Sequence, residues 1–360
     1  MSSGEINNKV IYSTDNMISK IGFSNSSAKW VKEKSVLIAL AGQGKTRGTV
    51  AISEIPLTTN QSIAAIQPDS FLYYKFLFQN LEERYNELRE VSSGDGTRGG
   101  LNKQIISDLE VLAPEIQEQI KIGDFLCGID TLITLHQRKY DKLTKVKKAM
   151  LEKMFPENGS PYPEIRFKGF TDAWEQHKLG EFADIVGGGT PSTSNFEYWD
   201  GDIDWYAPAE IADQIFVSSS ERKITQQGYD NSSAKMLPVG TVLFTSRAGI
   251  GKTAILRKEG CTNQGFQSIV PHINELDSYF IFSRSEEMKR YGETVGAGST
   301  FVEVSGKQMA NMELMMPTTM EEQVTIGSFF RNLDSIITLH QRKLEKLKNI
   351  KKACLEKMFV

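Results

Sequence analysis

Residues 133–155 read ITLHQRKYDKLTKVKKAMLEKMF, and residues 337–359 read ITLHQRKLEKLKNIKKACLEKMF. Seventeen of these 23 positions are identical, at a constant offset of 204. Apolar residues recur at steps of three and four over 119–155 and 323–359, which predicts two long amphipathic helices suited to a coiled coil. We interpret the two histidines of the stripe as polar residues that set the helix register, not as catalysts. The positions that we expect to carry helix pairing are Ile133, His136, Leu143, Met150, Ile337, His340, Leu347 and Cys354.

The similarity continues upstream of each helix, in blocks that keep the same order. Small changes of offset between the blocks indicate loop insertions, which is where repeats usually diverge. A tandem duplication of one unit, a globular part followed by a helix, explains this order. The blocks are NSSAK (25–29 and 231–235), AGQGKT and AGIGKT (41–46 and 248–253), and Asn-Gln (60–61 and 263–264).

Composition excludes several classes of protein. The chain has 360 residues, 42 Lys+Arg against 45 Asp+Glu, and a formal charge of −3. No apolar run is long enough to span a bilayer, and three widely spaced cysteines suit a reducing cytoplasm. With four histidines and no CxxC motif, we expect no metal site. The two helices carry net charges of +4 and +5, which indicate either a solvated face or a surface that contacts nucleic acid or an acidic partner. The remaining residues carry −12, and this charge opposes DNA binding by bulk attraction.

The sequence of the globular parts predicts an α+β fold. Short β-branched stretches at 36–40, 49–52, 241–246 and 268–271 predict strands, and 71–91 and 278–295 each predict a helix. The predicted organisation is a first recognition domain over 1–118, a central helix over 119–155, a second domain over 156–322 and a C-terminal helix over 323–360.

The two GKT loops invite comparison with a phosphate-binding loop. That motif needs glycine at its first position, where this chain has Ala39 and Ser246, and β-branched residues replace the helix that should follow. A β-hairpin with glycine at positive φ is one interpretation, and a polar loop presented to a ligand is the other. The paired Asn-Gln amides would either satisfy buried backbone or bind adenine.

Motifs for hydrolysis, metalloprotease chemistry or amino-methylation are missing from the sequence, so we expect a binding protein without a catalytic site. Trp174 followed by KLG (178–180), GGGTPST (187–193), TNQGFQSI (262–269) and the LHQRK helix together resemble type I restriction–modification specificity subunits. The resemblance covers essentially the whole chain. Alternatives are a coiled-coil adaptor and, less favoured, a nucleotide-binding enzyme.

The resemblance implies a DNA-binding, non-catalytic subunit that needs no cofactor. It implies two target-recognition domains, each reading half of a bipartite, asymmetric site in double-stranded DNA. The two helices would pair antiparallel as a spacer of roughly 50 Å, about fifteen base pairs. It also implies docking of two methyltransferase subunits, with restriction subunits in the larger complex. The DNA-contact residues that we expect from it are Gln43, Lys45, Thr46, Arg47, Thr97, Arg98, Thr190, Ser192, Ser246, Arg247, Ser299 and Thr300.

The two copies are unequal in one respect. The second contains a leader, residues 167–208, that has no counterpart in the first, because Met1–Ile6 aligns with Tyr206–Ile211. We therefore expect the first domain to lack about forty residues of the repeat and to bind its half-site weakly, while helix pairing persists.

Overall fold

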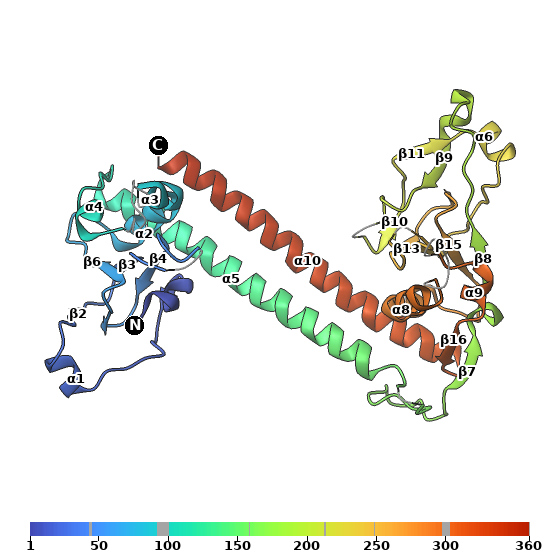
Figure 1. Ribbon diagram of the computed structural model, residues 1–360, viewed down its shortest axis with the longest axis horizontal. Coiled ribbons are helices and arrows are strands. Elements are labelled where there is room, and N and C mark those ends of the chain that lie inside the picture. The colour runs from blue at the N-terminus through green and yellow to red at the C-terminus, as the bar shows by residue number, and fades with distance from the viewer. Residues whose placement is uncertain are drawn as a thin grey trace. The chain divides into compact units, whose positions relative to one another are not determined.

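In the computed structural model, the chain forms two compact units. Unit 1 comprises Met1–Tyr140 and His340–Val360, and unit 2 comprises Asp141–Leu339. Figure 1 labels the elements of both. The residues that the structure describes are 1–42, 45–91, 101–157, 159–211, 214–247, 249–296 and 303–359.

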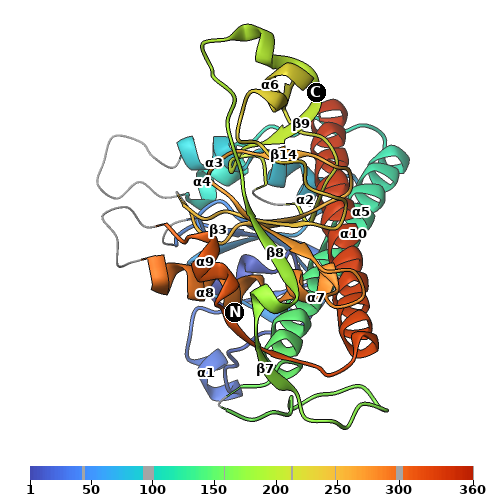
Figure 2. The ribbon, with the colours of Figure 1, turned by 90° about the vertical axis from the view of Figure 1, so that its right-hand side faces the viewer.

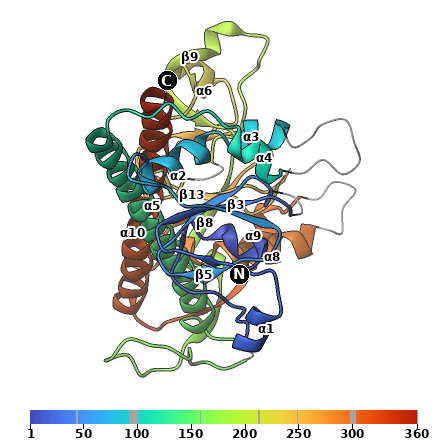
Figure 3. The ribbon, with the colours of Figure 1, turned by 90° about the vertical axis from the view of Figure 1, so that its left-hand side faces the viewer.

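The centre of unit 1 is a four-stranded sheet in the order β1-β4-β3-β6, with β1 parallel to β4 and β3 antiparallel to both of its neighbours. Strand β3 is buried on both faces, because Val36 and Ile38 pack toward helix α2 while Leu37 and Ala39 pack with Met1. This explains its unbroken apolar sequence. Figure 3 shows α2 and α3 beside the sheet. The elements are η1 Ser3–Asn7, β1 Val10–Ile11, α1 Lys20–Ser24, β2 Trp30–Val31, β3 Ser35–Ala39, β4 Val50–Ser53, β5 Leu57–Thr58, β6 Ile63–Ile66, α2 Tyr74–Glu83, α3 Tyr85–Val91 and α4 Lys103–Ser107.

Unit 2 repeats this sheet and adds a strand to it. The order is β10-β13-β12-β15-β8, again with one parallel pair at the β10 end, and β8 comes from the leader (Figure 2). The duplication and the α+β class predicted from the sequence are confirmed. The elements are β7 Glu175–Lys178, η2 Leu179–Glu181, β8 Ala183–Gly187, η3 Phe196–Tyr198, β9 Trp199–Tyr206, β10 Phe216–Val217, β11 Arg222–Ile224, α6 Gln226–Asp230, β12 Val242–Phe244, β13 Thr253–Leu256, β14 Cys261–Thr262, β15 Gln267–Pro271, α7 Ser278–Ser283, α8 Ser285–Gly296, α9 Gly306–Ala310 and β16 Glu313–Met316.

The helices expected over 71–91 and 278–295 are each broken in two, so that prediction was wrong. Arg84 separates α2 from α3, and Arg284 separates α7 from α8. Each guanidinium makes two hydrogen bonds to the glutamate three residues later and one to a distant carbonyl, that of Glu110 or Met315. These tertiary bonds hold the arginine in a turn, which helix propensity alone does not anticipate.

Two long helices follow the globular parts: α5 spans Ile116–Lys153 and α10 spans Met320–Met358. In unit 1, Leu126 and Ile129 of α5 pack on Leu355 of α10. In unit 2, Phe155, just after α5, stacks on Phe330 of α10 with ring centroids 6.0 Å apart. Among the described residues, no helix combines the length and apolar character needed to cross a membrane.

Glycines in the first turns of the long helices allow a close approach. A Cβ on Gly123 would lie 2.7 Å from the backbone nitrogen of Phe76, and one on Gly327 would lie 3.0 Å from that of Phe280. Phe76 and Phe280 are themselves 204 residues apart and lie near the start of α2 and of α7. The glycines that weaken the helix in isolation are therefore the points at which each helix meets its domain.

We predict that Gly123→Ala lowers the free energy of unfolding by about 2 kcal/mol, because the methyl group would press on the backbone of α2. Gly128→Ala is the matched control in the same helix: a Cβ there has nothing within 4 Å. It should raise stability by up to about 1 kcal/mol through helix propensity. Urea unfolding followed by circular dichroism measures both, and equal effects would contradict the packing role.

Candidate nucleic-acid interface

The two GKT stretches connect antiparallel strands, β3 to β4 in unit 1 and β12 to β13 in unit 2. Each is a hairpin that leads into a strand, as one of our interpretations held, and the helix of a phosphate-binding loop is absent there. Gly48 has φ +82° and Gly251 has φ +97°, a conformation that glycine adopts without strain. The first hairpin is longer, since 16 positions separate the paired residues Val36 and Ile52 against 13 for Val242 and Ile255.

In unit 1, the hairpin loop is tied to helix α3. The Tyr85 hydroxyl donates to the backbone oxygen of Lys45 (2.8 Å) and accepts from Arg89 (2.8 Å). Lys45 is exposed, Thr46 and Arg47 are half-buried, and Arg47 Nε is buried without a hydrogen-bond partner among the described residues. The hairpin therefore combines three cationic side chains from two elements, of which Arg89 was not predicted from the sequence.

In unit 2, the leader, the hairpin and the 263–265 turn meet. Gly189 N donates to Thr262 O (2.8 Å), and the Thr190 hydroxyl donates to Gln264 Oε1. Ser246 N donates to Gly265 O (2.8 Å), and Arg247 Nε lies 3.7 Å from where a Cβ of Gly265 would stand. Thr190, Gln264 and Arg247 thus gather around one turn. Gln264 belongs to the repeated Asn-Gln pair, and that repetition is the signal in the sequence that points to it.

The other predicted contact residues of unit 2 differ in exposure. Ser192 is exposed, with its hydroxyl 2.9 Å from that of Ser194. Ser246 is fully buried, with no partner for its hydroxyl in the described part of the chain, so the expectation of an exposed donor was wrong there: its backbone bonds to Gly265 and Val304 hold it in the interior just beyond β12. The residues that lie outside the described ranges are Gln43, Thr97, Arg98, Ser299 and Thr300.

The Asn-Gln amides are not buried, contrary to the interpretation that they satisfy buried backbone groups. Asn60 and Gln61 are exposed, and Asn263 is half-buried. Asn60 Oδ1 accepts from Ser62 N (3.1 Å) and Asn263 Oδ1 from Gly265 N (2.8 Å). Each asparagine closes a local turn, a geometry that its short side chain favours over core packing.

In each unit, a lysine and a buried aspartate form an ion pair that connects the two long helices. In unit 1, Lys351 Nζ lies 2.7 Å from Asp130 Oδ2, and Lys9 also pairs with Asp130. In unit 2, Lys147 Nζ lies 2.6 Å from Asp334 Oδ1. Both lysines and both aspartates are 204 residues apart, so the same bond is made twice with the roles of the helices exchanged. Burial alone would raise the pKa of Asp130, but Lys9 and Lys351 outweigh it and hold that pKa below its ordinary value.

The two stripe histidines contact each other. His136 Nδ1 and His340 Nδ1 are 2.8 Å apart, and these residues also differ by 204. Equivalent positions of the two long helices therefore contact each other within unit 1. Burial, the charge on His136, and nearby Lys139 and Lys343 all lower the pKa of His340.

The remaining predicted pairing positions are half-buried. Ile133, Leu347 and Cys354 pack against the cluster of Leu126, Ile129 and Leu355 in unit 1, and Met150 packs into the core of unit 2. Leu143 and Ile337 are half-buried. Lys147 and Lys351 were not among the predicted pairing residues. They belong to the basic residues that we interpreted as a solvated face, although both fall on the apolar stripe with its steps of three and four.

A family model described as type I restriction modification DNA specificity domain matches residues 2–145 and 171–349. The chain belongs to this family. The two matched ranges correspond to the two copies of the repeat.

Named relatives agree with this assignment. The specificity subunit of the type I restriction enzyme MjaIX from Methanocaldococcus jannaschii is 34% identical over 190 residues, which is 52% of this chain and 44% of that protein. The EcoR124I/EcoR124II specificity subunit of Escherichia coli is 29% identical over 184 residues, 48% of this chain and 44% of that protein. The chain thus spans about half the length of these curated relatives. The crystal structure of a type I restriction–modification S subunit from M. genitalium shares the fold, with a TM-score of 0.64 at 14% identity over 92% of this chain and 84% of that one.

We predict that Lys351→Met lowers the free energy of unfolding by about 2–3 kcal/mol, because it leaves a buried aspartate with one cation fewer. Lys352→Met is the matched control, since Lys352 is exposed and makes only a 3.8 Å pair with Glu356. The control should change stability by less than about 0.5 kcal/mol. If chemical denaturation ranked the two variants equally, Lys351 would be a surface lysine in solution.

The lowered pKa of His340 predicts a loss of stability in mild acid. Below the ordinary value of 6.5, the unfolded chain takes up a proton that folded His340 resists, so stability falls as pH drops through this range. Two other histidines have the opposite effect on stability. A hydrogen bond to Glu181 raises the pKa of His177. Burial alone would lower the pKa of His272, but Asp184 and Glu275 outweigh burial and raise that pKa. Melting temperatures between pH 7 and pH 5 should decline less in His340→Asn than in the wild type, and more in the control His272→Asn. Parallel curves for all three proteins would refute this assignment.

Proposed function

We propose that this chain is the DNA-specificity subunit of a type I restriction–modification complex, with no catalytic step of its own. The observation that carries the proposal is the duplication: both copies of the family domain present a loop-bearing hairpin, and the same Lys–Asp bond is made in each unit. Relatives named as specificity subunits support it. All three cysteines are free, which suits a cytoplasmic protein.

In this proposal each domain reads one half of a bipartite, asymmetric site on double-stranded DNA. Lys45, Thr46 and Arg47 act in the first domain, and Thr190, Ser192 and Arg247 in the second; hydroxyl, amide and guanidinium groups are the side chains that read base edges and bind phosphates. Because the hairpin of the first domain is longer than that of the second, the two domains present different contact residues and read half-sites of different sequence. Loop cations from two elements, such as Lys45 and Arg89, counter the acidic charge of the rest of the chain locally.

The helices α5 and α10 serve as the spacer. At 1.5 Å per residue, a helix of 38 residues extends about 57 Å, the length of about 17 base pairs. Buried Lys–Asp pairs fix the register of the two helices, so the separation of the half-sites would be a property of helix length.

The exposed faces of both helices are proposed docking sites for two methyltransferase subunits, which restriction subunits join in the full complex. Leu135 and Leu339 occupy the same position of the repeat, and their side chains are 51% and 49% exposed. The arginine and lysine that follow in each copy, at 138–139 and 342–343, are also identical and exposed. Identical exposed residues that the fold does not require indicate one kind of partner, bound twice.

The test is co-expression with a cognate methyltransferase, followed by mapping of methylated sites. A bipartite methylated sequence and co-purification of two methyltransferase subunits are the expected results. Methylation without a dependence on this chain, or co-purification without any site-specific methylation, would refute the proposal, and the latter would favour an adaptor.

Substitutions should affect the half-sites separately. We expect Arg47→Ala to weaken recognition of one half-site and Arg247→Ala of the other, each by about 1–3 kcal/mol, because each removes a cationic donor from one domain. Lys168→Ala, an exposed lysine outside both hairpins, is the control and should leave the methylated sequence unchanged. Loss of specificity at the same half-site in both arginine variants would contradict the assignment of one domain to each half.

A further inference from the structure

In both units, a cationic side chain from a helix lies on the glycine that stands two residues before the second strand of the GKT hairpin. In unit 1, a Cβ on Gly48 would lie 3.5 Å from Cγ of Arg89, on α3. In unit 2, a Cβ on Gly251 would overlap Cβ and Cγ of Lys289, on α8. Both glycines have positive φ, so few other residues suit these positions. The aliphatic stem of one cation therefore packs on each hairpin.

The two cations occupy equivalent positions of the duplication. Arg89 and Lys289 are 200 residues apart, and the residue before each, Leu88 or Met288, is 0% exposed. The offset is 200 and not 204 because α2 has 10 residues where α7 has 6, a difference of about one helical turn. The matching stretches are RYNELR (84–89) and RSEEMK (284–289).

The cation of unit 1 is fixed by a tyrosine. Arg89 donates to the Tyr85 hydroxyl (2.8 Å), which donates in turn to the backbone oxygen of Lys45 in the hairpin (2.8 Å). The Arg89 guanidinium also lies over the Tyr85 ring, 5.6 Å from its centroid. The charge is therefore held at the hairpin and does not move with a flexible side chain.

Unit 2 fixes its cation differently. Ser285 stands in the place of Tyr85, and its hydroxyl lies 2.8 Å from that of Thr253. Lys289 is half-buried, and within the described part of the chain its ammonium has no ion pair or hydrogen bond. Glu287 of the same helix binds Arg284 instead. A lysine whose stem is packed while its charge is unused by the fold is suited to a ligand.

The duplication has kept the charge at this position and has not kept the shape of the side chain. Arginine offers a planar fork of donors for bidentate contacts, and lysine offers a compact point charge, so the two are not interchangeable where such a contact is read. A phosphate oxygen accepts from either. The exchange of Arg89 for Lys289 therefore favours a phosphate over a base edge as the ligand.

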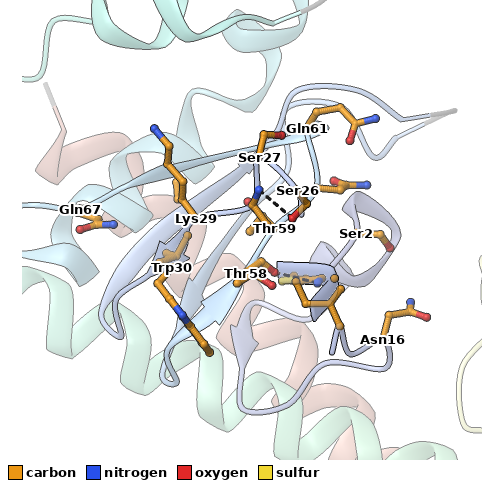
Figure 4. Close-up of a pocket in the computed structure, with 17 residues that line it drawn as sticks. Ser2, Asn16, Ser26, Ser27, Lys29, Trp30, Thr58, Thr59, Gln61 and Gln67 are labelled. Atoms are coloured by element: carbon orange, nitrogen blue, oxygen red, sulfur yellow. Dashed lines mark hydrogen bonds between the residues drawn. The ribbon is translucent and has the colours of Figure 1, made fainter. Parts of the chain in front are cut away.

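The cations are concentrated at the hairpins and not in the cavity of unit 1. Figure 4 shows this cavity, of about 720 Å³, with Ser26, Thr59 and Gln61 in its lining. Among the described side chains that line it, Lys29 alone carries a charge. The hairpin side, with Lys45 and Arg89, offers the better surface for a polyanion.

We propose that Arg89 and Lys289 bind phosphates of the DNA backbone beside the two half-sites. This inference rests on the proposed function and adds a division of labour to it. The helix cation holds each hairpin against the duplex whatever the sequence, and Arg47 or Arg247 of the hairpin reads bases. Loss of a helix cation should therefore weaken binding to every sequence equally.

Lys289→Met tests this, because it keeps an unbranched stem on Gly251 and removes the charge. The complex with a cognate methyltransferase is titrated by fluorescence anisotropy with two duplexes, one with the methylated site and one without it. We expect both affinities to fall by the same factor, up to about eightfold at about 0.1 M salt, and the slope of log affinity against log salt to shrink by about 0.9, the loss of one phosphate contact. Lys289→Arg should bind as the wild type does, and Arg89→Met should behave as Lys289→Met.

Arg290→Met is the matched control, since Arg290 is the next residue of α8, is exposed, and bonds to Glu286 O of its own helix (3.3 Å). It should leave the salt slope unchanged. An equal loss in this control, an unchanged slope in Lys289→Met, or a loss confined to the duplex with the site would overturn the proposal. So would loss of methyltransferase co-purification in Lys289→Met, because the ligand would then be a protein. A wild-type complex that bound neither duplex would instead refute the proposed function, and this inference with it.

Discussion

The buried Lys–Asp pair, made once in each unit, is the interaction on which the arrangement of the long helices depends. Asp130 and Asp334 are 8% and 5% exposed, and a carboxylate so covered is costly unless a cation reaches it. Lys351 and Lys147 reach them only in one register. A slip of one heptad would place an apolar residue opposite each aspartate and leave both lysines unpaired. A polar contact within an apolar stripe therefore selects the register that hydrophobic packing alone leaves open.

Given that register, the same few contacts attach each globular part to its helix. Gln119 accepts from Tyr73 N and donates to Phe71 O, and Gln323 accepts from Asp277 N and donates to Glu275 O. These bonds fix the segment before α2 or α7 at the point where Gly123 or Gly327 lets the helix approach. Gln119, Gly123 and Asp130 recur 204 residues later as Gln323, Gly327 and Asp334. The duplication therefore included the contacts between each domain and its helix as well as the domain itself.

Periodicity was enough to predict the two long helices, the hairpins and the duplication, because these depend on patterns that are local or repeated. Periodicity did not predict the features that tertiary contacts determine. Arg84 and Arg284 break helices because of carboxylates and carbonyls that the fold brings to them. Lys351 looked like a member of a basic face, and only the position of Asp130 shows that it is buried. Ser246 looked like a loop donor because its neighbours are polar, but backbone hydrogen bonds with Gly265 and Val304 hold it in the interior.

The charge balance connects these contacts to the proposed function. Acidic domains cannot attract DNA in bulk, so binding requires cations concentrated at the loops. Tyr85 brings Arg89 to the hairpin that carries Lys45 and Arg47, which joins charges from α3 and the loop at one corner of unit 1. Lys147 and Lys351, in contrast, are neutralised inside the helix pair. The basic residues therefore divide by location into those that bind the buried aspartates of the long helices and those left available to a nucleic acid, a division that composition alone does not reveal.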